Sequence, residues 1–205
     1  MMNAYDKTYR YDTMRNLGAM LDYAVNTCGE NLAFFWAKFL ASGIAEEIAR
    51  GNPHYLCGLS GVELAREAAR STGPELPPAS PRIDTGSPEY WTGWILAYLQ
   101  WSLNLSFSEL EAAGLCITDI YAHYNPLHEA GEDRALSFAE ARMLPGWEGK
   151  RLKRIRKAAG LTQEALSERS GVPLRNIRAY EQGRIPLDKA ASGSLRALYL
   201  AIGLA

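Results

Sequence analysis

The chain has 205 residues, of which 47% are apolar and 22% charged, and its formal net charge is −1. This length suits two domains, and the composition is that of a globular protein that can bury a core without disulfides or metals. The three cysteines (Cys28, Cys57 and Cys116) are odd in number and form no C-x-x-C pair, which argues against a disulfide framework and a cysteine zinc site.

The first part of the sequence places hydrophobic residues at helical spacing. This periodicity predicts one helix over Tyr11–Cys28 and a second over Asn31–Arg50. Ser60 and Glu63 have the spacing of a capping box, so a third helix is expected to open there and to run to about Arg70.

A change of composition follows the third helix. Ser71–Pro88 is rich in proline, glycine and serine, which predicts a linker or a long surface loop. Helical spacing then resumes, with a second capping box at Ser106 and Glu109. Helices are expected over Glu89–Leu103, Ile117–Tyr124 and Asp133–Met143. The pair Pro145–Gly146 marks a domain boundary.

Four aromatic residues recur three or four positions apart in the helix expected at Glu89–Leu103: Trp91, Trp94, Tyr98 and Trp101. Such a stripe is typical of core packing, because aromatic side chains bury large apolar areas. The alternative interpretation is a surface that binds a partner protein, since Trp and Tyr are frequent at the centres of interfaces.

The same region has no recognisable catalytic or metal-binding motif. Asn125 and Pro126 separate His123 from His128 and Glu129, so the histidines do not share a helix face as metal ligands would. Neither a Gly-rich phosphate loop nor a nucleophile elbow is present. We therefore expect no enzyme activity, no catalytic residues, no cofactor and no metal. The polar N-terminus and the short apolar stretches predict a cytoplasmic protein.

Charge separates the two ends of the chain. Residues 149–205 carry twelve lysines and arginines against four acidic residues, a net of +8, whereas residues 1–148 carry ten against nineteen, a net of −9. A basic region on an acidic body favours a polyanion as partner of the basic region. We expect an acidic helical domain of unknown function over residues 1–146 and a basic domain over residues 149–205.

The basic domain has the sequence signals of short helices joined by tight turns. Gly160 suits the left-handed end of one helix, and the Thr162 hydroxyl suits the N-cap of the next. Gln163 follows at the start of that helix, where its amide and the free backbone N–H groups can meet a phosphate. Gly171 makes the next turn, and Pro173 is expected to start the following helix, where its missing N–H costs nothing.

The helix expected to start at Pro173 exposes Leu174, Arg175, Arg178 and Ala179. The major groove of DNA admits one helix, and an arginine can make a bidentate contact with guanine. Two arginines with small or apolar neighbours on a short exposed helix therefore predict contact with double-stranded DNA.

The spacing of these residues resembles the Xre/Cro-type, phage-repressor-like family of helix-turn-helix domains. The resemblance covers about residues 150–204 and rests on these positions: Leu152–Arg156, Gly160–Gln163, Leu166, Gly171, Val172, Ile177, Tyr180, Glu181 and Gly183. It implies an all-α protein in which an N-terminal helical bundle precedes a five-helix DNA-binding domain.

The resemblance also implies a role for each exposed residue. Gln163 contacts a phosphate, Leu174 and Arg175 contact bases, and Arg178 and Ala179 face a base edge or the backbone. Leu174 departs from the polar residue frequent at its position, and it can touch a thymine methyl group instead. The expected DNA-binding residues are Lys150, Lys153, Arg154, Thr162, Gln163, Pro173, Leu174, Arg175, Arg178, Ala179 and Arg184.

Two further residues of the resemblance are structural. Many members of the family pair an arginine of the first helix with a glutamate near the end of the recognition helix, and Arg156 and Glu181 occupy these places. We therefore expect an ion pair between them. Pro173 departs from the Ser or Thr cap that is frequent at its position.

The N-terminal region resembles an uncharacterised helical domain found ahead of such DNA-binding domains, through Gly43–Glu46, Gly58–Ala65 and Glu89–Trp101. Three hypotheses follow. The first is a transcriptional repressor of its own operon, bound as a homodimer to half-sites about one helical turn apart. The second is an antitoxin whose N-terminal domain binds a partner protein such as a toxin. The third is a ligand-sensing regulator. No membrane contact is expected.

Overall fold

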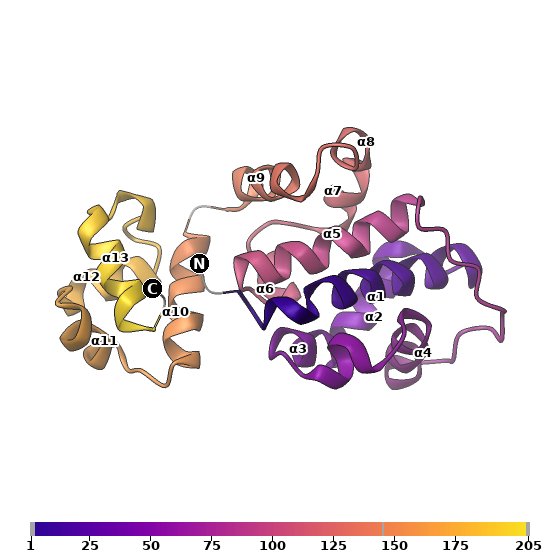
Figure 1. Ribbon diagram of the computed structural model, residues 1–205, viewed down its shortest axis with the longest axis horizontal. Helices are drawn as coiled ribbons and strands as arrows, with labels where there is room; N and C mark the ends of the chain where they lie inside the picture. Colours follow the sequence, from indigo (N-terminus) through magenta and orange to yellow (C-terminus); the bar gives the residue numbers. More distant parts are fainter. Residues whose placement is uncertain (1–2, 145, 204–205) are drawn as a thin grey trace. The chain divides into compact units, whose positions relative to one another are not determined.

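The computed structural model describes residues 3–144 and 146–203. These residues form helices and no strand, which confirms the predicted all-α fold. They divide into two compact units, the N-terminal unit (residues 3–142) and the C-terminal unit (from residue 143 onward), shown in Figure 1. Pro145, placed by the sequence at a domain boundary, lies outside the described residues.

The N-terminal unit is built from short and medium-length helices. Its α-helices are α1 (Arg10–Asp22), α2 (Leu32–Ala41), α3 (Ile44–Ala49), α4 (Gly61–Thr72), α5 (Pro88–Leu103), α6 (Phe107–Ala112), α7 (Ile117–Ala122), α8 (Tyr124–Leu127) and α9 (Glu132–Arg142). A 3-10 helix, η1 (Lys7–Tyr9), and two π-helical turns, η2 (Tyr23–Thr27) and η3 (His54–Gly58), complete it. Both predicted capping boxes form, at Ser60 with Glu63 and at Ser106 with Glu109.

The prediction of a single helix over Asn31–Arg50 is wrong, because the structure has two helices there, α2 and α3. Gly43 separates the two helices with a φ of 82°, a left-handed conformation that favours glycine. The break turns the chain, so that each helix presents its own apolar side to the core. Phe35 and Phe39 are buried from α2, and Ile48 is buried from α3.

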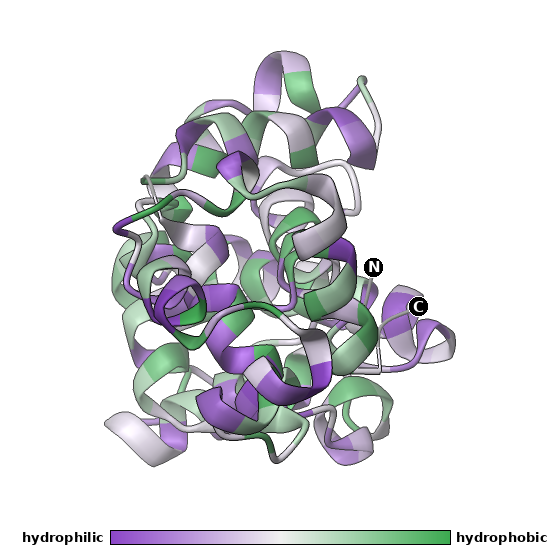
Figure 2. Ribbon diagram, turned by 90° about the vertical axis from the view of Figure 1, so that its left-hand side faces the viewer, coloured by the Kyte–Doolittle hydropathy of each residue, from purple (hydrophilic) through white to green (hydrophobic). Residues whose placement is uncertain are grey.

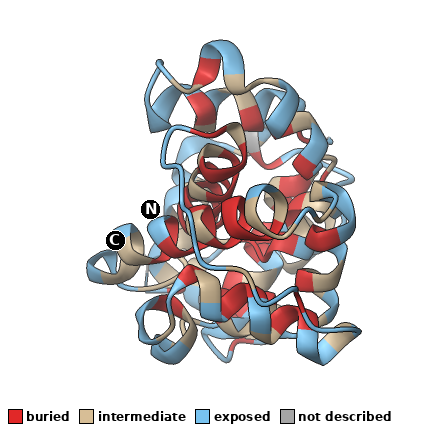
Figure 3. Ribbon diagram, turned by 90° about the vertical axis from the view of Figure 1, so that its right-hand side faces the viewer, coloured by how far each residue is buried: buried red, intermediate tan, exposed pale blue. Residues whose placement is uncertain are grey.

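Helix α1 lies at the centre of the N-terminal unit and packs closely against α5 and α4 (Figure 1). Glycines allow these close approaches: a Cβ atom on Gly93 of α5 would overlap the Leu17 carbonyl group, and one on Gly61 of α4 would overlap the Asn16 carbonyl oxygen. Figure 3 shows buried residues along much of the central helices. The backbone of α1 therefore forms part of the core itself.

The proline-rich segment is a surface loop within the N-terminal unit and joins α4 to α5. We call residues 73–87 the α4–α5 loop. The loop is tied to α1 and η2: the Asp84 N–H donates to Asp22 Oδ2 at 3.0 Å, and the Tyr23 hydroxyl donates to the Ala79 carbonyl at 3.2 Å. Asp22 also accepts a hydrogen bond from the Ser87 hydroxyl, which caps α5. These hydrogen bonds fix the α4–α5 loop against α1 and η2.

The C-terminal unit contains α10 (Trp147–Ala158), α11 (Gln163–Ser170), α12 (Leu174–Glu181), η4 (Leu187–Lys189) and α13 (Ser192–Ala201). The five expected helical segments are thus four α-helices and one 3-10 turn. Helix α10 begins at Trp147, directly after Gly146. Polar and apolar residues alternate around individual helices in Figure 2, and the apolar sides meet in one core. That core contains Leu152, Ile155, Leu166, Ile177, Tyr180 and Leu198.

Among residues 3–144 and 146–203, no helix combines the length and the apolar character that a bilayer crossing requires.

Candidate nucleic-acid interface

The turns between α10, α11 and α12 have defined caps. Gly160 has a φ of 69° and follows the end of α10, and Gly171 has a φ of 70° and ends α11. The Thr162 hydroxyl caps α11 by accepting a hydrogen bond from the Ala165 N–H at 3.0 Å. The two glycines supply the positive φ angles that other residues adopt at a cost.

Helix α12 begins one residue later than the sequence predicts. Pro173 occupies the N-cap position with a φ of −55° and a ψ of 135°, and Leu174 is the first helical residue. The Pro173 carbonyl accepts the hydrogen bonds of the Asn176 and Ile177 N–H groups, at 2.8 and 3.2 Å. Proline therefore fixes the start of α12 through its backbone, in place of the side-chain cap that a serine or threonine would provide.

One side of α12 is buried and the other is accessible. Ile177 and Tyr180 enter the core. Arg175 and Arg178 are exposed, and Leu174 and Ala179 are half-buried beside them. The exposed side therefore offers two cations beside apolar side chains, which is complementary to the acceptor atoms of guanine and the methyl group of thymine in the major groove.

Glu164 of α11 holds one of these arginines. Its Oε1 accepts a hydrogen bond from Arg178 Nη2 at 2.9 Å, and both side chains are about half exposed. The pKa of Glu164 is lowered by its own backbone N–H, by Arg178 and by Thr162, so the carboxylate is charged at neutral pH. The sequence prediction did not include this pair, which joins the start of α11 to the exposed side of α12.

A buried network joins α10, α11 and α12 beneath that surface. Arg156 Nε donates to Glu181 Oε1 at 2.6 Å, and Arg156 Nη2 donates to Glu181 Oε2 at 3.0 Å. Gln163 Nε2 donates to the same Glu181 Oε2 at 2.7 Å, and Arg156 Nη1 donates to the Leu161 carbonyl at 2.6 Å. The hydrogen bond to Glu181 raises the pKa of Arg156 further, so the guanidinium stays charged. The network fixes the Gln163 amide at the start of α11.

Comparison with known proteins supports this geometry. The family model of a helix-turn-helix domain matches residues 149–199. The C-terminal unit is a helix-turn-helix domain. No curated protein and no solved structure matches the chain. The family match lies wholly in the C-terminal unit, so α10–α13 are the elements to which its description applies.

The helix-turn-helix domain carries further cations outside α12. Lys150 and Lys153 of α10 are exposed, and Arg154 is half-buried. Arg184 is exposed in the segment that follows α12. Thr162 and Pro173, at the starts of α11 and α12, are also exposed. Each of the predicted DNA-contacting residues is therefore at least partly accessible on its own element, with Gln163 half-buried by its bond to Glu181.

Two glycines bring α10 against α12 and were not predicted as packing residues. A Cβ atom on Gly149 would collide with the Tyr180 carbonyl oxygen, and one on Gly146 would lie 3.2 Å from the Gly183 Cα atom. The backbones of α10 and α12 are thus in direct contact. The sequence signal was available, because a glycine inside a basic helix is costly unless close packing requires it.

The aromatic stripe of α5 is divided between core and surface. Tyr98 and Trp101 are buried, so the prediction that they belong to a partner-binding surface is wrong, and their role is core packing. Trp101 Nε1 donates to the Tyr5 carbonyl at 2.9 Å, and the Tyr98 hydroxyl donates to Asp133 at 3.1 Å. Trp91 and Trp94 are only half-buried. The first half of the stripe therefore remains accessible in the N-terminal unit.

Proposed function

We propose that the protein is a sequence-specific regulator of transcription that binds double-stranded DNA through α11 and α12 and represses its own operon. It binds as a homodimer to a pseudo-palindromic site whose half-sites are about one helical turn apart. Helix α12 enters the major groove, and the start of α11 meets the phosphate backbone.

The observation that carries this proposal is the accessible cationic side of α12. Arg175 is exposed on the first turn of α12, beside the half-buried Leu174. Because Ile177 and Tyr180 anchor the opposite side in the core, the helix presents these side chains from a rigid support. Arg175 then contacts guanine and Leu174 contacts a neighbouring methyl group.

Binding to the DNA upstream of the protein's own gene, measured by fluorescence anisotropy at two salt concentrations, tests the proposal. Lys150, Lys153, Arg154 and Arg184 are expected to contribute phosphate contacts, so log K should fall linearly with log salt. A scrambled duplex of equal length is the control, and multi-angle light scattering gives the mass of the bound species. Equal affinity for both duplexes would contradict sequence-specific regulation.

Replacing Arg175 with alanine is expected to weaken binding to the specific site by about 1–3 kcal/mol and to relax preference at one base pair. The reason is the loss of one bidentate base contact, which non-specific DNA does not offer. Anisotropy on a panel of single-base operator variants measures this effect. Arg196→Ala is the matched control, because Arg196 is exposed on α13 and its replacement also removes one positive charge. An equal loss on every duplex would refute the base contact.

Replacing Glu164 with glutamine is expected to raise the affinity for all duplexes roughly three- to tenfold at low salt. The substitution removes a negative charge from the surface that faces DNA and frees Arg178 from its 2.9 Å contact. The salt slope should steepen by about 1, since one more cation meets a phosphate. Glu168 is exposed on the same helix, and Glu168→Gln should change affinity less. Identical gains for the two variants would assign the effect to net charge alone.

A second candidate function is an antitoxin whose N-terminal unit binds a partner protein. The accessible Trp91 and Trp94, with Tyr11 60% exposed beside them, favour it. Co-expression with the product of an adjacent small reading frame, followed by co-purification, separates this function from simple regulation. A stable complex that Trp94→Ala disrupts would support the antitoxin.

A further inference from the structure

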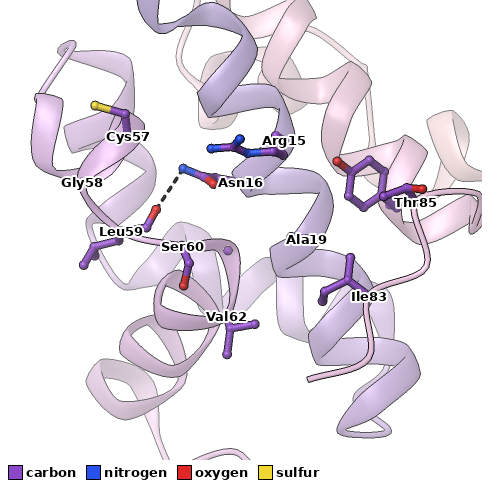
Figure 4. A pocket seen from close by; sticks show the side chains of 12 residues that line it. Arg15, Asn16, Ala19, Cys57, Gly58, Leu59, Ser60, Val62, Ile83 and Thr85 are labelled. Atoms are coloured by element: carbon purple, nitrogen blue, oxygen red, sulfur yellow. Dashed lines mark hydrogen bonds between the residues drawn. The ribbon is translucent and has the colours of Figure 1, made fainter. Parts of the chain in front are cut away.

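A groove of about 500 Å³ lies along α1 in the N-terminal unit. Figure 4 shows Arg15, Asn16 and Ala19 of α1 between the segment that precedes α4 and the residues Ile83 and Thr85 of the α4–α5 loop. The Asn16 side-chain amide donates to the Leu59 carbonyl at 2.9 Å and fixes one wall. The volume is within the range of sites that bind small organic molecules.

The groove has one charged residue among those that line it, and this residue is a cation. Arg15 is half exposed, and its Nη2 lies 3.0 Å from Asp12, which leaves its other N–H groups for a ligand. Residues 1–148 carry a net charge of −9, so an anion is repelled by most of this region. Arg15 therefore gives this groove a charge that is complementary to an anionic ligand.

Tyr90 supplies a second donor in the same groove. Its ring packs against the backbone of Gly18, where an added Cβ atom would lie 3.0 Å from Tyr90 Cζ. Burial, and then the neighbouring Tyr11, raise the pKa of Tyr90, so its hydroxyl is neutral at physiological pH, and Tyr90 and Arg15 line the same groove. A neutral hydroxyl and a guanidinium are both hydrogen-bond donors, and together they suit a carboxylate.

An aromatic surface continues the groove. A second hollow of about 390 Å³ shares Tyr90 and Thr85 with the groove and adds Tyr11, Trp91 and Trp94. The Tyr11 and Trp94 rings meet edge to face with centroids 5.0 Å apart, and the Tyr90 and Trp94 rings stack at 6.2 Å. Rings held in this way offer faces and edges on which a further aromatic ring can pack.

We propose that this groove and the adjoining aromatic hollow together bind one small aromatic carboxylate. The carboxylate accepts hydrogen bonds from the Arg15 guanidinium and the Tyr90 hydroxyl, and the ring lies against Trp94. This site is where a ligand-sensing regulator would bind its ligand. The proposal that the site binds a carboxylate does not depend on DNA binding. Its test contains no DNA, so failure of the DNA proposal and failure of this one are distinguishable.

Isothermal titration of the full chain with naphthalene-2-carboxylate and with its uncharged carboxamide tests the site. We expect one molecule of carboxylate bound per chain, and an affinity at least roughly threefold above that of the amide. Arg15→Gln and Tyr90→Phe should each weaken carboxylate binding roughly three- to tenfold, since the guanidinium is partly solvated, and should weaken amide binding less, because the amide oxygen is an uncharged and weaker acceptor. Trp94→Ala should weaken both ligands alike.

Arg50→Gln is the matched control for Arg15→Gln. Arg50 is exposed and pairs with Glu47 three residues away, as Arg15 pairs with Asp12, but it does not line the groove. This variant should bind both ligands as the parent chain does. The proposal is overturned by absence of saturable carboxylate binding, by equal affinity for acid and amide, or by equal behaviour of the Arg15 and Arg50 variants.

Discussion

Replacement of Glu181 with alanine is expected to destabilise the helix-turn-helix domain by about 3–5 kcal/mol, because it leaves a buried cation without its partner. Glu181 and Arg156 have side-chain exposures of only 2% and 7%, so solvent does not compensate the loss. The substitution also removes the acceptor for Gln163 and loosens the start of α11. DNA affinity should fall with stability, since α12 ends at Glu181.

Hydrogen exchange of the amides in α10–α12, followed by mass spectrometry, measures this effect locally. A local measurement is needed because a chain of two compact units need not unfold in one step. Glu168→Ala is the control: Glu168 is exposed on α11, and its loss should change stability by no more than about 0.5 kcal/mol. If Glu181→Ala exchanged no faster than Glu168→Ala, the network would have no structural role.

Local signals in the sequence predicted much of the helix-turn-helix domain. Gly160 and Thr162 lie at the end of one helix and the start of the next, as their conformational preferences require. Ser60 with Glu63 likewise forms a capping box in the N-terminal unit. These signals involve residues within a few positions of one another, so they can be interpreted without knowing the tertiary structure.

Features that depend on contacts between helices were missed. Glu164 and Arg178 are 14 positions apart and become neighbours only when α11 packs against α12. The break at Gly43 was missed for another reason: the apolar run from α2 to α3 satisfies a helical pattern by itself, and this pattern outweighed the local signal of the glycine. Core packing was the favoured interpretation of the aromatic stripe and holds for Tyr98 and Trp101, but the sequence did not show that Trp91 and Trp94 stay half-buried. Periodicity identifies an apolar side, but not which of its residues remain at the surface.

The assignment of DNA-contacting residues remains a prediction, and it too rests on local signals in the sequence. Arg175 and Arg178 are exposed on α12, and their outward direction follows from the burial of Ile177 and Tyr180. Exposure makes a contact possible, and the base that each arginine selects depends on how α12 enters the groove. We expect the packing of α12 on α10, where Gly149 and Tyr180 meet, to influence that geometry.

Replacement of Gly149 with alanine is therefore expected to impair both folding and DNA binding. The new Cβ atom would collide with the Tyr180 carbonyl oxygen, a backbone atom that no rotamer change can move. Forcing a methyl group into such a contact costs about 1–3 kcal/mol, and α10 and α12 must separate to relieve it. Hydrogen exchange should quicken in both helices, and anisotropy should report weaker binding to the specific duplex.

Gly193→Ala is the matched control for Gly149→Ala. Gly193 also lies near the start of a helix, α13, but a Cβ atom there would meet nothing within 4 Å. Because alanine is the better helix former, this variant should be neutral or more stable by up to about 1 kcal/mol. Both variants exchange a glycine for an alanine in the first turn, so their difference isolates the contact between α10 and α12. Equal stability and equal DNA affinity in the two variants would show that this contact does not position α12.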